Sequence, residues 1–123
     1  MKLMKCFPLQ FLLYVLFAAS VSAATVDDIK IYSSTTGKGP GTVILVHGWT
    51  CDSSSWQYQV PELSKDYRVI TLDLPGHGQS GSPKDSALSM DLFARAVEAV
   101  RAEAKADRVA LVGHRERRRA RRA

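Results

Sequence analysis

The segment YRVITLDLPGHGQSG, residues 67–81, joins an apolar run to a glycine-rich turn. Its first part, YRVITLDL (67–74), is rich in β-branched and aliphatic residues, and TVILV (42–46) and RVALV (108–112) have the same character. Nearly continuous apolar runs of this length are typical of strands that are covered on both faces, as in parallel sheets. We therefore predict a sheet built around these three segments, with 108–112 as its exposed last strand.

Helical patterns separate the three runs. In SSSWQYQVPELSKD (53–66), Trp56, Val60 and Leu63 recur at helical spacing. Ser54 and Gln57 fit a capping box at its start. Pro61 is expected to kink or restart this helix, because proline cannot donate the backbone hydrogen bond that a helix interior needs.

The second helical pattern, SMDLFARAVEAVRAEAKAD (89–107), consists mostly of strong helix formers, with Ser89 as N-cap and Asp91 in the first turn. IKIYSS (29–34) alternates more and is predicted as an earlier strand at an edge. The order strand, helix, strand, helix, strand predicts an α/β fold with a doubly wound, mostly parallel sheet and right-handed crossovers.

The N-terminus has the three parts of a secretory signal. MKLMK (1–5) is basic, FLLYVLFAA (11–19) is uncharged and apolar, and Val21 and Ala23 are small residues suited to a cleavage site. Nine apolar residues are too few to span a bilayer, which needs roughly 20. We expect cleavage after Ala23, so that 1–23 is a signal peptide, the protein is exported, and this segment is its only contact with a membrane. An uncleaved anchor is the alternative.

The net charge of +5 comes from the two ends. Residues 115–123, RERRRARRA, alone carry +5, whereas residues 24–114 carry −2. The body of the chain therefore gives no reason to expect a nucleic-acid partner. We expect the Arg-rich end to be a disordered segment that arises from a shifted reading frame and truncates the domain at residue 114. A natural basic tail that binds an anionic partner, in a protein without enzymatic activity, is the alternative.

Glycine and histidine occur together directly after all three apolar runs. HGWTCDSSS (47–55) follows the first, DLPGHGQSG (73–81) ends the second, and GH (113–114) ends the third. Sites in such sheets form at the carboxyl ends of the strands, and glycine allows tight turns there. The residues expected to shape this rim after the second and third runs are Asp73, Gly76, His77, Gly78, Gly113 and His114.

These three segments, in this order and spacing, resemble the first half of the α/β-hydrolase fold. The resemblance covers residues 29–114 and implies a serine-dependent hydrolase of small esters or related acyl compounds, without a cofactor. It implies that His47, Gly48 and Trp49 form the oxyanion-hole turn, with the Trp49 amide as one donor. Gly113 and His114 match the start of the nucleophile elbow G-x-S-x-G.

The resemblance fails at the nucleophile itself. Arg115 stands where the family has serine, and Arg117 stands where it has the final glycine. A protonated guanidinium has no nucleophilic lone pair. The acid and histidine of the family triad come later in the chain than the elbow. We therefore expect this polypeptide to be an inactive, truncated family member.

Three other patterns have simpler explanations. Asp73, His77 and Ser80 form a triad-like set in one loop, but in this family they are expected to be turn residues. The three histidines His47, His77 and His114 have the same explanation, so no metal site is predicted. Cys51 remains alone once Cys6 leaves with the signal, and it is expected to be an incidental turn residue.

Overall fold

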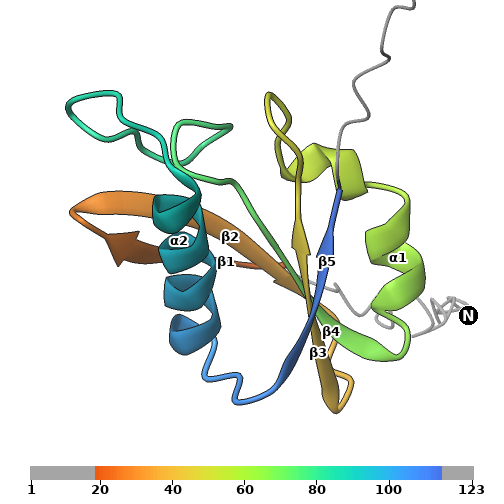
Figure 1. The fold of residues 1–123 in the computed structure, drawn as a ribbon. Coiled ribbons are helices and arrows are strands. Elements are labelled where there is room, and N and C mark those ends of the chain that lie inside the picture. Colours follow the sequence, from red (N-terminus) through yellow and green to blue (C-terminus); the bar gives the residue numbers. More distant parts are fainter. Residues whose placement is uncertain (1–18, 115–123) are drawn as a thin grey trace, which may run out of the picture.

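The structure, a computed structural model, describes residues 19–114. Five strands form one sheet in the order β1-β2-β4-β3-β5 (Figure 1). β3 pairs in parallel with β4 and with β5, whereas β2 is antiparallel to both β1 and β4. Only β2 therefore runs against the others, which confirms the mostly parallel sheet. The strand bounds are β1 (Ser20–Val26), β2 (Ile29–Thr36), β3 (Gly41–Val46), β4 (Tyr67–Leu72) and β5 (Val109–Gly113).

Helices cover opposite faces of this sheet (Figure 1). Successive side chains of a strand point to opposite faces, and β3 shows the consequence. Its Ile44 packs with the buried residues of α2 (Met90–Glu103). Val43 and Leu45 pack instead around Trp56, on the side of the 3-10 helix η2 (Ser53–Trp56) and α1 (Gln59–Leu63). The nearly continuous apolar runs are thus explained by two cores, one on each face.

The N-terminal hairpin was not anticipated. β1 and β2 are joined by Asp27 and Asp28, whose φ angles of 48° and 63° are those of a tight hairpin turn. β1 occupies the edge, so β2 lies between β1 and β4, and the prediction that 29–34 forms an edge strand was wrong. Alternation in β2 has a different reason, since Ile29 and Ile31 enter the core beneath α2 while the opposite face is less covered.

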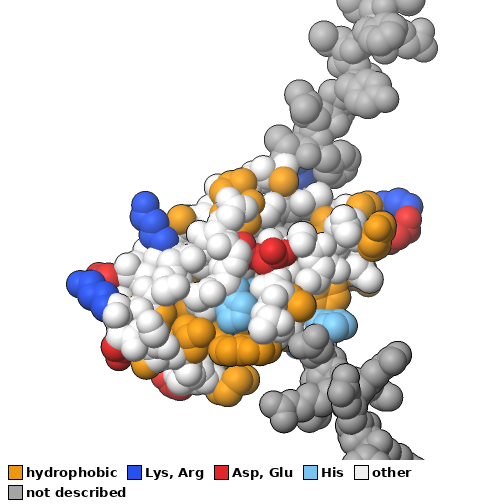
Figure 2. Space-filling model, turned by 90° about the horizontal axis from the view of Figure 1, so that it is seen from above, with side chains coloured by type: hydrophobic (Ala, Val, Ile, Leu, Met, Phe, Trp, Pro, Cys, Tyr) orange, Lys and Arg blue, Asp and Glu red, His pale blue; other side chains and the backbone are white. Residues whose placement is uncertain are grey.

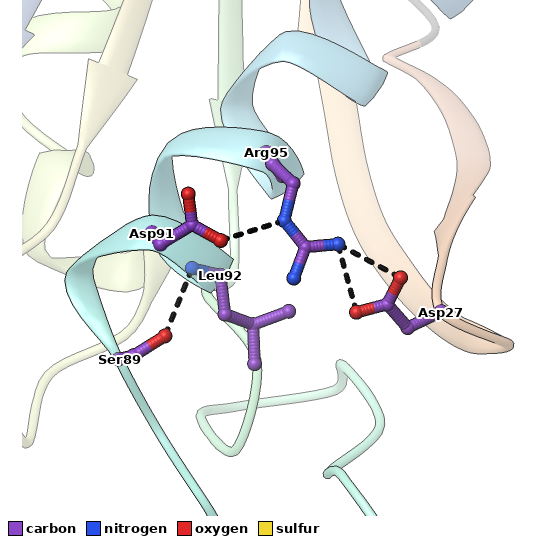
Figure 3. A network of polar contacts seen from close by, with 5 residues as sticks. All are labelled: Asp27, Ser89, Asp91, Leu92 and Arg95. Carbon is purple, nitrogen blue, oxygen red and sulfur yellow. Dashed lines mark hydrogen bonds and ion pairs between the residues drawn. The ribbon is translucent and has the colours of Figure 1, made fainter.

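The start of α2 is held by a side-chain cap and by ion pairs of Arg95, one of them to the turn between β1 and β2 (Figure 3). Ser89 Oγ accepts a hydrogen bond from the Leu92 amide at 3.1 Å, which confirms the predicted cap. Arg95 donates to Asp91 at 2.9 Å and to both carboxylate oxygens of Asp27 at 2.8 Å. These ion pairs are exposed to solvent and therefore contribute little to stability, whereas the cap satisfies a backbone amide of the first helical turn.

The segment 53–66 is two short pieces instead of one helix. Asp52 caps η2, because its carboxylate accepts a hydrogen bond from the Ser54 amide at 2.8 Å. Hydrogen bonding by Ser54 also lowers the pKa of Asp52. The predicted capping box of Ser54 and Gln57 was therefore wrong. The helix does restart, as α1, with Pro61 in its first turn where no amide donor is needed.

The strand bounds differ from the predictions by one or two residues, and α2 ends at Glu103, four residues before the end of the predicted segment. β4 ends at Leu72 and not at residue 74, and β5 covers Val109–Gly113. β5 is the predicted exposed edge of the described sheet, with Leu111 61% and Val112 42% exposed. Leu111 pairs with Ile44 and Val112 with Leu45, so their side chains lie on opposite faces.

Candidate active site at the carboxyl ends of the strands

The turns after β3, β4 and β5 meet at one end of the sheet, as predicted. The amide of His114 donates to the carbonyl of Val46 at 3.0 Å, which joins the third turn to the first. The first and second turns are joined by side chains that bond to each other's backbone. Figure 2 looks onto this end of the molecule, where histidine side chains lie beside a group of apolar side chains.

His47 joins the first turn to the second. Its ring is buried, with 3% exposure, and Nε2 accepts a hydrogen bond from the Leu74 amide at 3.0 Å. Nδ1 lies 2.8 Å from the carbonyl oxygen of Gly48. An amide can only donate and a carbonyl can only accept, so the ring is neutral with its proton on Nδ1.

His77 makes the reciprocal connection. Its Nε2 accepts a hydrogen bond from the Thr50 amide at 3.2 Å, and Nδ1 lies 3.0 Å from the carbonyl oxygen of Pro75. The same reasoning places its proton on Nδ1. The ring centroid is 5.2 Å from those of His47 and Trp49. His77 is therefore both a hydrogen-bond acceptor for the first turn and a packing surface for Trp49.

Asp73 is the third connection between these turns. Its side chain is almost fully buried, and its carboxylate accepts hydrogen bonds from the amides of Ser53 at 2.7 Å and Gln79 at 2.9 Å. Gly78 passes directly against it with φ at 49°, and a Cβ there would lie 2.2 Å from Asp73 Oδ2. The predicted need for glycine in this turn thus has a steric cause.

Ser80 and its neighbours do not form a relay. Ser80 Oγ donates to the carbonyl oxygen of Asp73 and accepts from the Tyr32 amide at 2.8 Å. Among the hydrogen bonds of residues 19–114, none joins the side chains of Asp73, His77 and Ser80 to one another. All three hold backbone in place.

Trp49 lies at the tip of the first turn, with 56% of its side chain exposed. The next residue, Thr50, has φ at 67°, a conformation that β-branched residues rarely adopt. No hydrogen bond within the described part of the chain uses the Trp49 amide as donor. The amide that the resemblance assigns to the oxyanion hole is thus without a protein acceptor there.

A cavity of about 640 Å³ opens beside this turn. The turn residues His47, Gly48 and Trp49 form one side, and Met90, Phe93 and Val97 of α2 form another. The contribution of α2 was missed by the sequence analysis, although its apolar periodicity was recognised. Only the crossing of the helix over the sheet turns that apolar face toward the site.

The third turn is described as far as His114. The exposed ring of His114 contacts Trp56 edge-on, with the two ring centroids 6.3 Å apart. Gly113 lines the cavity, and a Cβ there would meet no described atom within 4 Å, so space alone does not require this glycine. Arg115 and Arg117 lie outside the described residues.

Other candidate chemistry is limited. In residues 19–114, no three side chains of His, Cys, Asp or Glu are grouped so that they could hold a metal ion. Cys51 is half-buried, and its amide donates to the Gly48 carbonyl at 3.2 Å, closing the first turn.

Comparison with known proteins agrees with this geometry. The chain is 35% identical over 97 residues to the dihydrolipoyllysine-residue acetyltransferase component of the acetoin cleaving system of Cupriavidus necator, covering 79% of this chain and 26% of that protein. It is 46% identical over 59 residues to the pimeloyl-[acyl-carrier protein] methyl ester esterase of Nitrosomonas europaea, covering 48% and 22%. The crystal structure of an epoxide hydrolase from Vigna radiata superposes with a TM-score of 0.71 at 26% identity, covering 79% and 32%.

The chain thus spans about a quarter of these two relatives and about a third of the epoxide hydrolase chain. The model of the alpha/beta hydrolase fold matches residues 41–114, which include all three turns. The chain belongs to the α/β-hydrolase fold family.

Proposed function

We propose that this chain carries the oxyanion side of an acyl-ester hydrolase site, and that the polypeptide does not itself complete hydrolysis. The supporting observation is the Trp49 turn, whose unengaged amide lies beside an apolar cavity. An amide held in this way stabilises the negative oxygen of a tetrahedral intermediate, and one such donor is worth about 3 kcal/mol. The similar methyl ester esterase supports an ester substrate.

The cavity favours an ester with a small apolar acyl group. Phe93, Val97 and Leu74 line it with carbon atoms, and charged side chains are absent from its described lining. Apolar walls with a few placed polar groups are usual for small-molecule sites. The substrate is therefore proposed to be an uncharged small ester, bound without a cofactor.

The proposed lack of hydrolysis rests on Arg115 at the nucleophile position. Serine attack needs an activating base as well as the hydroxyl. His47 and His77 are both committed to backbone amides through Nε2, so neither ring has a free basic nitrogen. Changing Arg115 to serine thus restores the hydroxyl without a base from either of these two turns.

The test compares initial rates of p-nitrophenyl acetate hydrolysis by the chain and by Arg115→Ser, purified identically. Both are expected to match the buffer rate. Ester binding is followed separately through Trp49 fluorescence with methyl butyrate, using Trp49→Phe as the signal control. Serine-dependent turnover by Arg115→Ser would contradict the proposed inactivity, and the absence of any saturable Trp49 response would contradict the ester site.

We also propose that the protein is exported and that residues 1–23 are removed. The apolar segment 11–19 and the small residues Val21 and Ala23 support this. Within residues 19–114, no helix combines the length and apolar character needed to cross a bilayer. The proposed cut falls inside β1, so the exported protein would keep only residues 24–26 of this strand and lose residues 20–23, which pair with residues 32–35 of β2. N-terminal sequencing of exported protein tests this: Ala24 is the expected first residue, and an intact Met1 would refute it.

A further inference from the structure

A second cavity of about 820 Å³ lies at the opposite end of the sheet, where β3 and β4 begin. Its walls come from β1 and β2, the loop from Gly37 to Gly39, the end of α1 and the last turn of α2. Figure 1 shows that this end is remote from the three histidine-containing turns. The cavity is therefore separate from the candidate active site.

Arg68 is one of the four charged residues that line this cavity. Its guanidinium donates to the carbonyl oxygen of Ala104, at the end of α2, with an N–O distance of 2.9 Å. No carboxylate of the described residues lies within ion-pair distance of it. A half-buried guanidinium with one bond made has further donors available, and their fork shape matches a carboxylate or phosphate.

The strand register places a hydroxyl beside Arg68. Thr35 pairs with Ile70, and Arg68 is two residues before Ile70 on the same strand face. Diagonal neighbours of this kind lie roughly 7–8 Å apart, so one small anion can reach both side chains. The Thr35 hydroxyl has no hydrogen-bond partner within residues 19–114 and lines the cavity.

The rest of the lining has a net positive charge and an apolar floor. Lys38 and Lys65 contribute two more cations, although Lys65 is already paired with Glu62 at 2.9 Å, and Glu103 is the single carboxylate of the lining. Ile70 and Val100 form the floor. Ser20 and Ser22 of β1 also line the cavity, but they precede the proposed cleavage point, so the contacts to a ligand are assigned only to residues that follow it.

We propose that this cavity binds a small organic anion, a carboxylate or phosphate carried on a compact apolar body. Arg68 donates hydrogen bonds to two oxygens of the anion, and the Thr35 hydroxyl donates a third hydrogen bond to it. The apolar body of the ligand lies on Ile70 and Val100. This site is independent of ester hydrolysis at the other end of the sheet, so either proposal can fail without the other.

The test is a titration of the isotope-labelled chain with phenyl phosphate, followed through backbone amide NMR shifts at constant ionic strength. Inorganic phosphate and phenol are titrated separately, because the first represents only the anionic group of phenyl phosphate and the second only its aromatic ring. Saturable shifts are expected at Thr35, Ser64 and Val100, and not at Trp49 or Gly113. Phenyl phosphate is expected to bind more tightly than either part.

Variants identify the residues responsible. Arg68→Gln is expected to weaken binding about tenfold or more, because it removes charge-assisted hydrogen bonds. Lys30→Gln loses the same charge outside the cavity and is expected to bind as the unchanged chain does. Thr35→Val, which keeps the side-chain shape, is expected to weaken binding severalfold and serves if Arg68→Gln does not fold. Shifts that centre on Trp49, equal binding by Arg68→Gln and Lys30→Gln, or no saturable shift would each overturn the proposal.

Discussion

The imidazole of His77 accepts a hydrogen bond from the backbone amide of Thr50, 27 positions earlier in the sequence. The imidazole of His47 accepts one from Leu74, in the opposite direction between the same two turns. Each turn therefore supplies a histidine that fixes the backbone of the other. Trp49 lies between these two anchors, so its amide is positioned by residues from both strands.

Exchanging either histidine for phenylalanine is expected to release one specific amide. His77→Phe keeps an aromatic surface but removes the acceptor for Thr50, while His47→Phe removes the acceptor for Leu74. Loss of one hydrogen bond of about 0.5–1.5 kcal/mol corresponds to amide exchange roughly two to thirteen times faster. Hydrogen exchange read by mass spectrometry or NMR measures this. Each variant is the control for the other, and equal acceleration of both amides in both variants would refute separate anchors.

Asp73→Asn is expected to destabilise the protein by about 1–3 kcal/mol, because the buried carboxylate accepts two amide hydrogen bonds and the amide NH₂ of asparagine cannot accept one. The measurement is the urea midpoint of unfolding. Asp85→Asn is the matched control, since its exposed carboxylate accepts only a local bond from the Ala87 amide. If both variants unfold at the same urea concentration, Asp73 does not hold the turns together.

β5 is expected to cause self-association. Leu111 and Val112 place apolar side chains on opposite faces of the strand at the edge of the described sheet, a combination that favours pairing with another chain. Leu111→Lys is expected to shift the sedimentation profile toward the monomer, because a charge on an edge strand opposes such pairing. Tyr58→Lys removes an exposed aromatic side chain that is not part of β5 and is the control. Equal association of all three proteins would show that β5 is not the contact.

Local sequence patterns determined much of the fold. The β-branched runs form β3, β4 and β5 because continuous apolar character suits strands covered on both faces. Ser89 caps α2 because its hydroxyl needs only the amide three residues later. The meeting of the three glycine and histidine turns followed from parallel strand direction alone.

Only the tertiary structure decided how those turns are held together and what surrounds them. The bonds from Thr50 to His77 and from Ser53 to Asp73 join residues 27 and 20 positions apart. Phe93 lines the cavity because the packing of α2 on the sheet brings its ring to 6.1 Å from that of Trp49 in the first turn. β1 was not predicted, because its first residues were interpreted as the end of a signal peptide. Small residues suit a signal-peptide cleavage site as well as an edge strand. These features depend on long-range contacts, whose partners become neighbours only when the sheet has formed.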